Sequence, residues 1–271
     1  MHFDIDLLAN FDLYSWQIIS LLLLAGFMVG FINTIAGSGT VITYSLFMML
    51  GLPANVANGT IRLGVVMQTL LATLNFRKHQ KLDFKKGLKL AIPVIIGSVI
   101  GAQIAASIDE NIFRKILAGV LFIMLIFLFA DPKKWLKDQL HLINRKPDFI
   151  QISIFLGIGL YGGFIHIGVG IILLSAIVLN AGYDLVKANA IKVMIVFLYS
   201  PFALVVFMLN SQVHYGIGLI AAIGNVAGGI VGSNMAISKG SGFVRWILVA
   251  VILLFAGYLL DIPSIIGRLS A

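Results

Sequence analysis

The sequence predicts an all-α polytopic membrane protein built from two inverted-topology repeats. We expect about 8 to 10 transmembrane or half-membrane helices, with broken helices at the repeat interface. Three observations predict this class. The 271-residue chain is 60% hydrophobic and only 11% charged, one gapless register of glycines relates its two halves, and the basic loops change position between those halves.

The composition excludes a soluble globule. A soluble domain carries roughly a quarter charged residues, so a chain with 11% cannot cover its surface with polar side chains. Its long apolar runs favour a helical bundle over a barrel of alternating strands. The net charge of +8 comes from loop cations, which topology and acidic membrane lipids explain, so we expect no nucleic-acid partner. The absence of cysteine excludes disulfides and cysteine metal sites.

The first repeat is predicted to cover residues 13–130. Its predicted spans are residues 13–35, 56–76, 88–106 and 116–129. A shorter apolar segment, residues 40–50, is too short for an untilted crossing, and the sequence leaves open whether it crosses the membrane or dips into it. The densest basic loop, residues 77–86, should be cytoplasmic.

A hydrophilic linker, residues 131–148, separates the first repeat from the second, which is predicted at residues 149–262. Its basic residues place the linker on the cytoplasmic side. The first twelve residues contain no Lys or Arg. We therefore expect no cleaved signal peptide and an N-terminus outside the cytoplasm.

A constant offset of 131 residues relates the two halves. It pairs Gly37 with Gly168, Gly39 with Gly170, Gly51 with Gly182, and Asn58 with Asn189. A gapless match over most of both halves indicates an internal duplication. The basic loop 77–86 corresponds to residues 208–217, which contain no Lys or Arg. By the positive-inside rule the two repeats therefore have opposite orientations.

Each half contains a glycine-rich interruption in its apolar sequence. The first comprises Gly37, Ser38, Gly39 and Thr40, and the second comprises Gly168 and Gly170. Irregular backbone at membrane depth is tolerated only where it lines a cavity or is buried in protein. A half-helix beginning near Thr40 would direct its positive end at the break, where an anion could bind. Alternatively, the glycines only allow close helix packing.

Two cations, Arg62 and Lys192, are predicted within apolar helices. Arg62 lies about 10 Å inside the helix that begins near Asn55, and Lys192 is similarly deep in its own helix. No carboxylate lies nearby in the apolar spans, so we expect two unpaired cations in a cavity that suits an anionic substrate. The alternative is that both side chains snorkel to the interface.

Several neutral side chains complete the predicted substrate site. They are Asn33, Asn58, Thr60 and Asn189. These groups either donate to substrate oxygens or bond across the bundle. His166 either binds substrate and carries a proton, or is hydrogen-bonded structure. The sequence has no HExxH, no phosphate-binding GxxxxGK and no carboxylate pair within a span, so we predict no catalytic residue, no metal and no cofactor.

Five segments resemble the sulfite exporter TauE/SafE family. They are GFINTIAGSG (30–39), GLPANVANGTIRLG (51–64), FRKHQKLDF (76–84), GGFIHIGVG (162–170) and KANAIKV (187–193). The resemblance implies a permease of the bacterial inner membrane whose relatives export sulfite, organosulfonates or related sulfur anions. It carries over both glycine breaks, the segment 58–62, and Asn189 with Lys192. The chain departs from the family pattern at Ile61, where an Asn often precedes the basic residue.

The sequence therefore predicts a secondary transporter that exports a small anion, such as sulfite or an organosulfonate, by alternating access. A passive anion channel is the first alternative. A membrane-embedded enzyme is another, in which His166 would be the acid or base, and a structural subunit is the third. The coupling ion, a proton or sodium, and a homodimer are left open.

Overall fold

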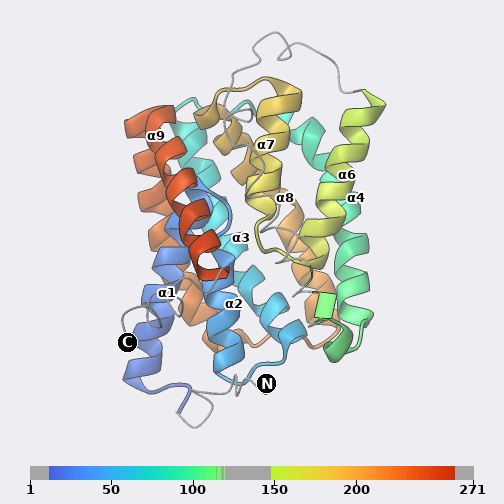
Figure 1. Ribbon diagram of the computed structural model, residues 1–271, viewed down its shortest axis with the longest axis vertical. Helices are drawn as coiled ribbons and strands as arrows, with labels where there is room; N and C mark the ends of the chain where they lie inside the picture. Colours follow the sequence, from blue (N-terminus) through green and yellow to red (C-terminus); the bar gives the residue numbers. More distant parts are fainter. Residues whose placement is uncertain (1–11, 114, 117–118, 120–147, 260–271) are drawn as a thin grey trace, which may run out of the picture.

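The computed structural model describes residues 12–259, except 114, 117–118 and 120–147. All regular structure in this part of the chain is α-helical (Figure 1). The helices are α1 (Trp16–Ile35), α2 (Thr40–Met49), α3 (Ala54–Lys78), α4 (Phe84–Ser107), α6 (Phe149–Phe164), α7 (Val169–Ala181), α8 (Leu185–Leu209) and α9 (Tyr215–Leu259). The predicted span 116–129 and linker 131–148 lie almost entirely outside the described residues.

Helix length separates full spans from half-spans. Among the described residues, α1, α4, α8 and residues 215–250 of α9 are long and apolar enough to cross a membrane. Helix α3 has 25 residues, but its polar side chains make it less apolar than these four. By contrast, α2 has 10 residues and α7 has 13. Their lengths of about 15 and 20 Å fall short of a hydrocarbon core of about 30 Å.

The backbone keeps the register that the glycines predict. Helices α3 and α8 differ by 131 at both ends (185 − 54 and 209 − 78), and α4 and α9 begin 131 residues apart (215 − 84). Left-handed backbone conformations recur at this offset in the pairs Gly37 and Gly168, Gly51 and Gly182, and Gln80 and Ser211. In Figure 1, α2 lies in the lower half of the bundle and α7 in the upper half. The inverted orientation of the repeats stays a prediction.

The two halves interlock. Helix α9 packs along α1 and α3, whereas α4 packs along α6 and α8, so the fourth helix of each half covers the other half. Glycines make these contacts close. A Cβ atom on Gly26 of α1 would lie 2.2 Å from the carbonyl oxygen of Ala221, and one on Gly97 of α4 would lie 2.2 Å from that of Leu156. Helices α3 and α8, which carry the two buried cations, pack against each other between these pairs.

Candidate functional site

The two glycine breaks touch each other inside the bundle. The first joins the end of α1 to the start of α2, and the second joins α6 to α7. The amide of Gly170 donates to the carbonyl oxygen of Gly37 at 3.2 Å. A Cβ atom on Gly37 would lie only 2.4 Å from Cα of Gly170. Gly37 also has a φ of +85°, which glycine adopts at little cost. No side chain fits where these two backbones meet.

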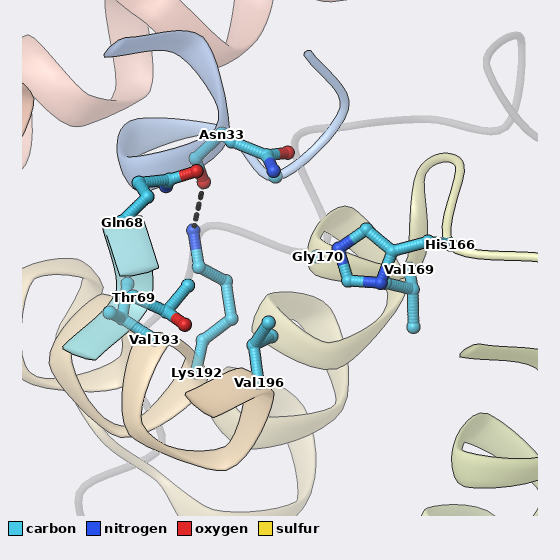
Figure 2. A pocket seen from close by; sticks show the side chains of 10 residues that line it. Asn33, Gln68, Thr69, His166, Val169, Gly170, Lys192, Val193 and Val196 are labelled. Carbon is cyan, nitrogen blue, oxygen red and sulfur yellow. Dashed lines mark hydrogen bonds between the residues drawn. The ribbon is translucent and has the colours of Figure 1, made fainter. Parts of the chain in front are cut away.

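A cavity with about 240 Å³ of empty space adjoins this contact (Figure 2). Its wall is formed by Asn33, Gly37, Gln68, Thr69, His166, Val169, Gly170, Lys192, Val193 and Val196. Only a small part of the space, enough for about one water molecule, is wide enough for solvent. The structure therefore shows this cavity in a narrow, closed form.

Lys192 brings a positive charge to the cavity wall. Its side chain is 1% exposed, and its Nζ donates to the carbonyl oxygens of Asn33 and Thr34, both at 3.1 Å. These carbonyls belong to the last turn of α1, where no further helical N–H is available to them. The C-terminal end of a helix also carries a partial negative charge. Lys192 therefore stabilises the end of α1 while it lines the cavity.

Arg62 has the corresponding role at the end of α6. Its Nη2 donates to the carbonyl oxygen of Gly163 at 2.6 Å, and both Nη atoms donate to that of Gly162 at 3.3 Å. The guanidinium is fully buried and lies 4.8 Å from the centre of the Phe207 ring. Arg62 does not line the cavity.

The two cations are therefore reciprocal. Each lies on the third helix of one half and binds carbonyls at the end of the first helix of the other half. The acceptor pairs are 129 residues apart (162 − 33 and 163 − 34), and the cations are 130 apart (192 − 62). The prediction that both cations are unpaired is wrong, because backbone carbonyls take the place of the missing carboxylates.

His166 lies in the second break, on the wall opposite Lys192. Figure 2 shows its imidazole ring pointing into the cavity, toward the side on which Lys192 lies. Its Nδ1 is 2.9 Å from the hydroxyl oxygen of Tyr199, a fully buried residue of α8. The side-chain amide of Gln68 donates to Oγ1 of Thr34 at 2.8 Å, and its Oε1 is buried without a hydrogen-bond partner. The wall therefore combines one cation with neutral polar groups.

Five of the predicted site residues line the cavity. They are Asn33, Gly37, His166, Gly170 and Lys192. Three more are buried polar residues next to it that lack hydrogen-bond partners: the hydroxyls of Ser38 and Thr40, and both side-chain polar atoms of Asn189. Asn189 precedes Lys192 by three residues and so lies on nearly the same face of α8. Gly39 and Gly168 are the residues that directly precede α2 and α7.

Two predicted residues, Asn58 and Thr60, bond across the bundle, which was the alternative role for them. Asn58 donates through Nδ2 to the carbonyl oxygen of Phe164 at 2.8 Å. The Thr60 hydroxyl donates to Val56 and accepts the amide of His214 at 2.9 Å. Neither residue lines the cavity.

Sequence reasoning did not single out Tyr199. An aromatic residue in an apolar helix is usually part of the core. The signal that could have found it is helical spacing, because Lys192, Val196 and Tyr199 follow one another at intervals of four and three on α8.

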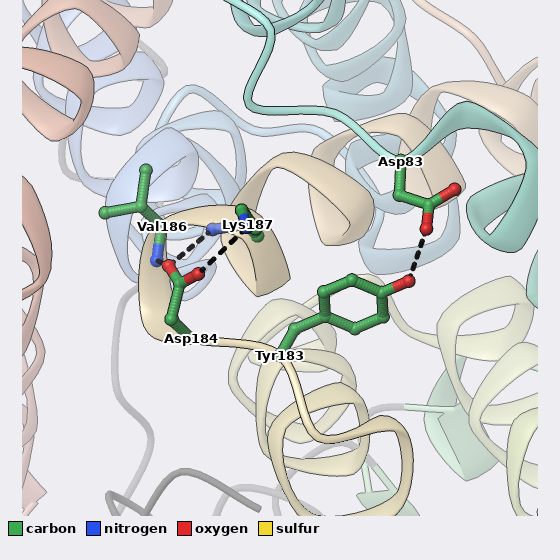
Figure 3. Close-up of polar contacts among 5 residues, drawn as sticks. All are labelled: Asp83, Tyr183, Asp184, Val186 and Lys187. Carbon is green, nitrogen blue, oxygen red and sulfur yellow. Dashed lines mark hydrogen bonds and ion pairs between the residues drawn. The ribbon is translucent and has the colours of Figure 1, made fainter. Parts of the chain in front are cut away.

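A second contact between the halves lies where α3 connects to α4 and α7 connects to α8 (Figure 3). The hydroxyl of Tyr183 donates to Oδ2 of Asp83, whose Oδ1 accepts the amide of Lys86 at the start of α4. Burial alone would raise the pKa of Asp83, but these hydrogen bonds and the charges of Lys86 and Lys187 hold it below its ordinary value. Burial and the bond to Asp83 raise the pKa of Tyr183.

We expect Asp83→Ala to lower the free energy of unfolding by about 1–3 kcal/mol, because it removes a helix cap and leaves the Tyr183 hydroxyl without its acceptor. Tyr183→Phe keeps the cap and should cost less. Since the folded pKa of Asp83 is depressed, its contribution is complete above the ordinary carboxyl pKa of about 4 and is lost as pH falls through the folded value. Thermal unfolding of the detergent-purified protein between pH 8 and pH 3 measures this. A variant as stable as wild type at pH 7 would contradict it.

Comparison with known proteins decides the family. The model of the sulfite exporter TauE/SafE family matches residues 22–259, which include all of the site residues above. The chain belongs to this family. It is 30% identical to a "probable membrane transporter protein" of Haemophilus influenzae over 229 residues, covering 84% of this chain and 89% of the relative. No solved structure shows a significant match.

Two further relatives have the same kind of name. A probable membrane transporter protein of Sinorhizobium sp. is 28% identical over 92% of this chain and 95% of its own length. The probable membrane transporter protein YfcA of Escherichia coli K12 is 27% identical over 86% of each chain. Together with the long apolar helices, these matches identify a multi-pass membrane protein of a transporter family and confirm the resemblance seen in the sequence.

Proposed function

We propose that this TauE/SafE protein is a secondary transporter that exports a small anion, such as sulfite or an organosulfonate, by alternating access around the cavity. One observation carries the proposal: the two broken helices meet at a cavity whose wall holds the buried ammonium of Lys192. Broken helices that meet inside the bundle are the usual substrate site of transporters with internal repeats.

The charges of the cavity favour an anion. Lys192 is the only formally charged residue among those that line it, and no carboxylate is present there. The neutral groups of Asn33, Gln68 and Thr69 can donate to oxygen atoms. Helices α2 and α7 both begin at the breaks, so their positive ends lie there. A cation site would need carboxylates in place of these groups.

The contacts of Lys192 suggest how binding could drive the conformational change. An ammonium has three donors, and two of them bind carbonyls at the end of α1. The third can reach an anion in the cavity. An anion that draws the ammonium further into the cavity weakens its hold on α1, so bound and empty states favour different positions of that helix.

The arrangement of the halves supports movement of one repeat against the other. The two short helices lie in opposite halves of the bundle, as inverted repeats require (Figure 1). The basic α3–α4 connection lies at the upper end of Figure 1, whereas α1 starts at the lower end. By the positive-inside rule, the start of α1 then lies outside the cytoplasm. We place the protein in the bacterial inner membrane.

Flux of labelled sulfite and of methanesulfonate into proteoliposomes tests the proposal. We expect saturable uptake that responds to a proton or sodium gradient and is stimulated by unlabelled anion on the opposite side. Flux without counterflow stimulation would indicate a passive channel instead. A converted product after incubation would indicate an enzyme. Absence of flux for both compounds would remove this substrate class.

A further inference from the structure

Tyr199 is a buried ionisable residue to which the proposed transport cycle assigns no role. It lies on α8, seven residues after Lys192, so the two residues share a face of that helix. Its side chain is 0% exposed, and its hydroxyl bonds to Nδ1 of His166 at 2.9 Å. His166 is itself 2% exposed and lines the cavity. Helix α8 therefore carries both the cavity cation and the group that holds the histidine.

The direction of this hydrogen bond decides what His166 offers to the cavity. A neutral imidazole carries its proton on one nitrogen and accepts at the other. If the Tyr199 hydroxyl donates to Nδ1, then Nε2 carries the proton. In the reverse case, the phenol hydrogen of Tyr199 would need a different acceptor within a fully buried site, and buried donors are rarely left unsatisfied. The bond from Tyr199 to Nδ1 is therefore the arrangement that satisfies both residues.

We propose that Tyr199 is a positioning residue that fixes the His166 tautomer, so that Nε2–H donates to the bound anion opposite Lys192. The ring points into the cavity with Nδ1 already engaged, so Nε2 is the nitrogen left for a ligand (Figure 2). This inference rests on the proposed function and deepens it. The anion is held between an ammonium from the second half's α8 and an imidazole donor that the same helix orients.

A double-mutant cycle tests this role of Tyr199. In Tyr199→Phe, the imidazole is free to place its proton on Nδ1, so we expect the Kd for sulfite or methanesulfonate to rise about three- to tenfold, the effect of one hydrogen bond. In His166→Gln, the amide supplies an N–H near the position of Nε2 without needing a partner at Nδ1. In that background, Tyr199→Phe should change the Kd less than twofold.

Tyr161→Phe is the matched control. Tyr161 is another tyrosine beside the second break, and its hydroxyl donates to the backbone carbonyl of Ile167 at 2.6 Å. Its removal should have the same effect on the Kd in both backgrounds, because it does not bind the imidazole. An equal effect of Tyr199→Phe in both backgrounds would overturn the positioning role.

A measurement on the unmutated protein covers the case in which Tyr199→Phe does not fold. The spectrum of ¹⁵N-histidine-labelled protein should show His166 protonated at Nε2 and bare at Nδ1, with the signal assigned by its loss in His166→Gln. The opposite tautomer would overturn the inference. If the unmutated protein binds neither anion, the proposed function fails as well. If it binds them and Lys192→Met does not, an additive cycle overturns only the role of Tyr199.

Discussion

Replacing Lys192 by methionine is expected to weaken anion binding by about 10- to 100-fold, because a hydrogen bond to a charged group contributes about 1.5–3 kcal/mol. Methionine keeps the length of the side chain and removes the charge. The ammonium is the only formal charge on the cavity wall, so no neighbouring residue can replace it. Saturable uptake into proteoliposomes, and the Kd measured on purified protein, both report this loss.

Lys187→Met is the matched control for this prediction. Lys187 lies on the same helix, but its side chain is half exposed and lies 4.0 Å from the carboxylate of Asp184. Exposed ion pairs contribute little, so this variant should bind the anion as the wild type does. Equal binding by wild type, Lys187→Met and Lys192→Met would remove the charge from the proposed site.

Arg62→Met separates the two cations. Both variants leave two buried carbonyls without their donor, so both should lower the free energy of unfolding, by about 2–4 kcal/mol. Only Lys192 lines the cavity. An added anion should therefore still raise the melting temperature of Arg62→Met but not that of Lys192→Met. If the anion stabilised neither variant, Arg62 would belong to the binding site as well.

The positions of the helices and breaks could be predicted because they depend on local sequence. The short helix expected at residues 40–50 is observed as Thr40–Met49, and the break before it contains Gly37 with a positive φ. Hydrophobic runs set the helices, and glycine marks the points where the backbone leaves them. A fixed glycine offset also needs no knowledge of three-dimensional contacts.

The partners of the charged residues could not be predicted in this way. Lys192 binds carbonyls 158 and 159 residues earlier in the chain, and Arg62 binds carbonyls 100 and 101 residues later. Every residue has a carbonyl, so composition and spacing give no sign of which ones a cation will meet. Thr60 illustrates the same limit, because its oxygen bonds to the amide of His214 on a distant loop.

Gly37→Ala is expected to abolish transport. The new Cβ would lie 2.4 Å from Cα of Gly170 and 2.6 Å from its carbonyl carbon, and backbone atoms cannot rotate away as a side chain can. Alanine at a φ of +85° costs a further 1–2 kcal/mol or so. Gly170→Ala places its Cβ at the same distance, 2.4 Å from Cα of Gly37, but in a helix, so it isolates the steric part of the effect.

Two controls decide whether the contact between the breaks matters for transport or only for packing. Gly157→Ala meets no atom within 4 Å and should be neutral, or stabilising by up to about 1 kcal/mol. Gly26→Ala disturbs the close contact between α1 and α9, far from the breaks in sequence, and should lower stability. If flux per folded molecule fell as much in Gly26→Ala as in Gly37→Ala, the glycines would serve helix packing alone. A selective loss in Gly37→Ala and Gly170→Ala would locate transport at the point where the two halves touch.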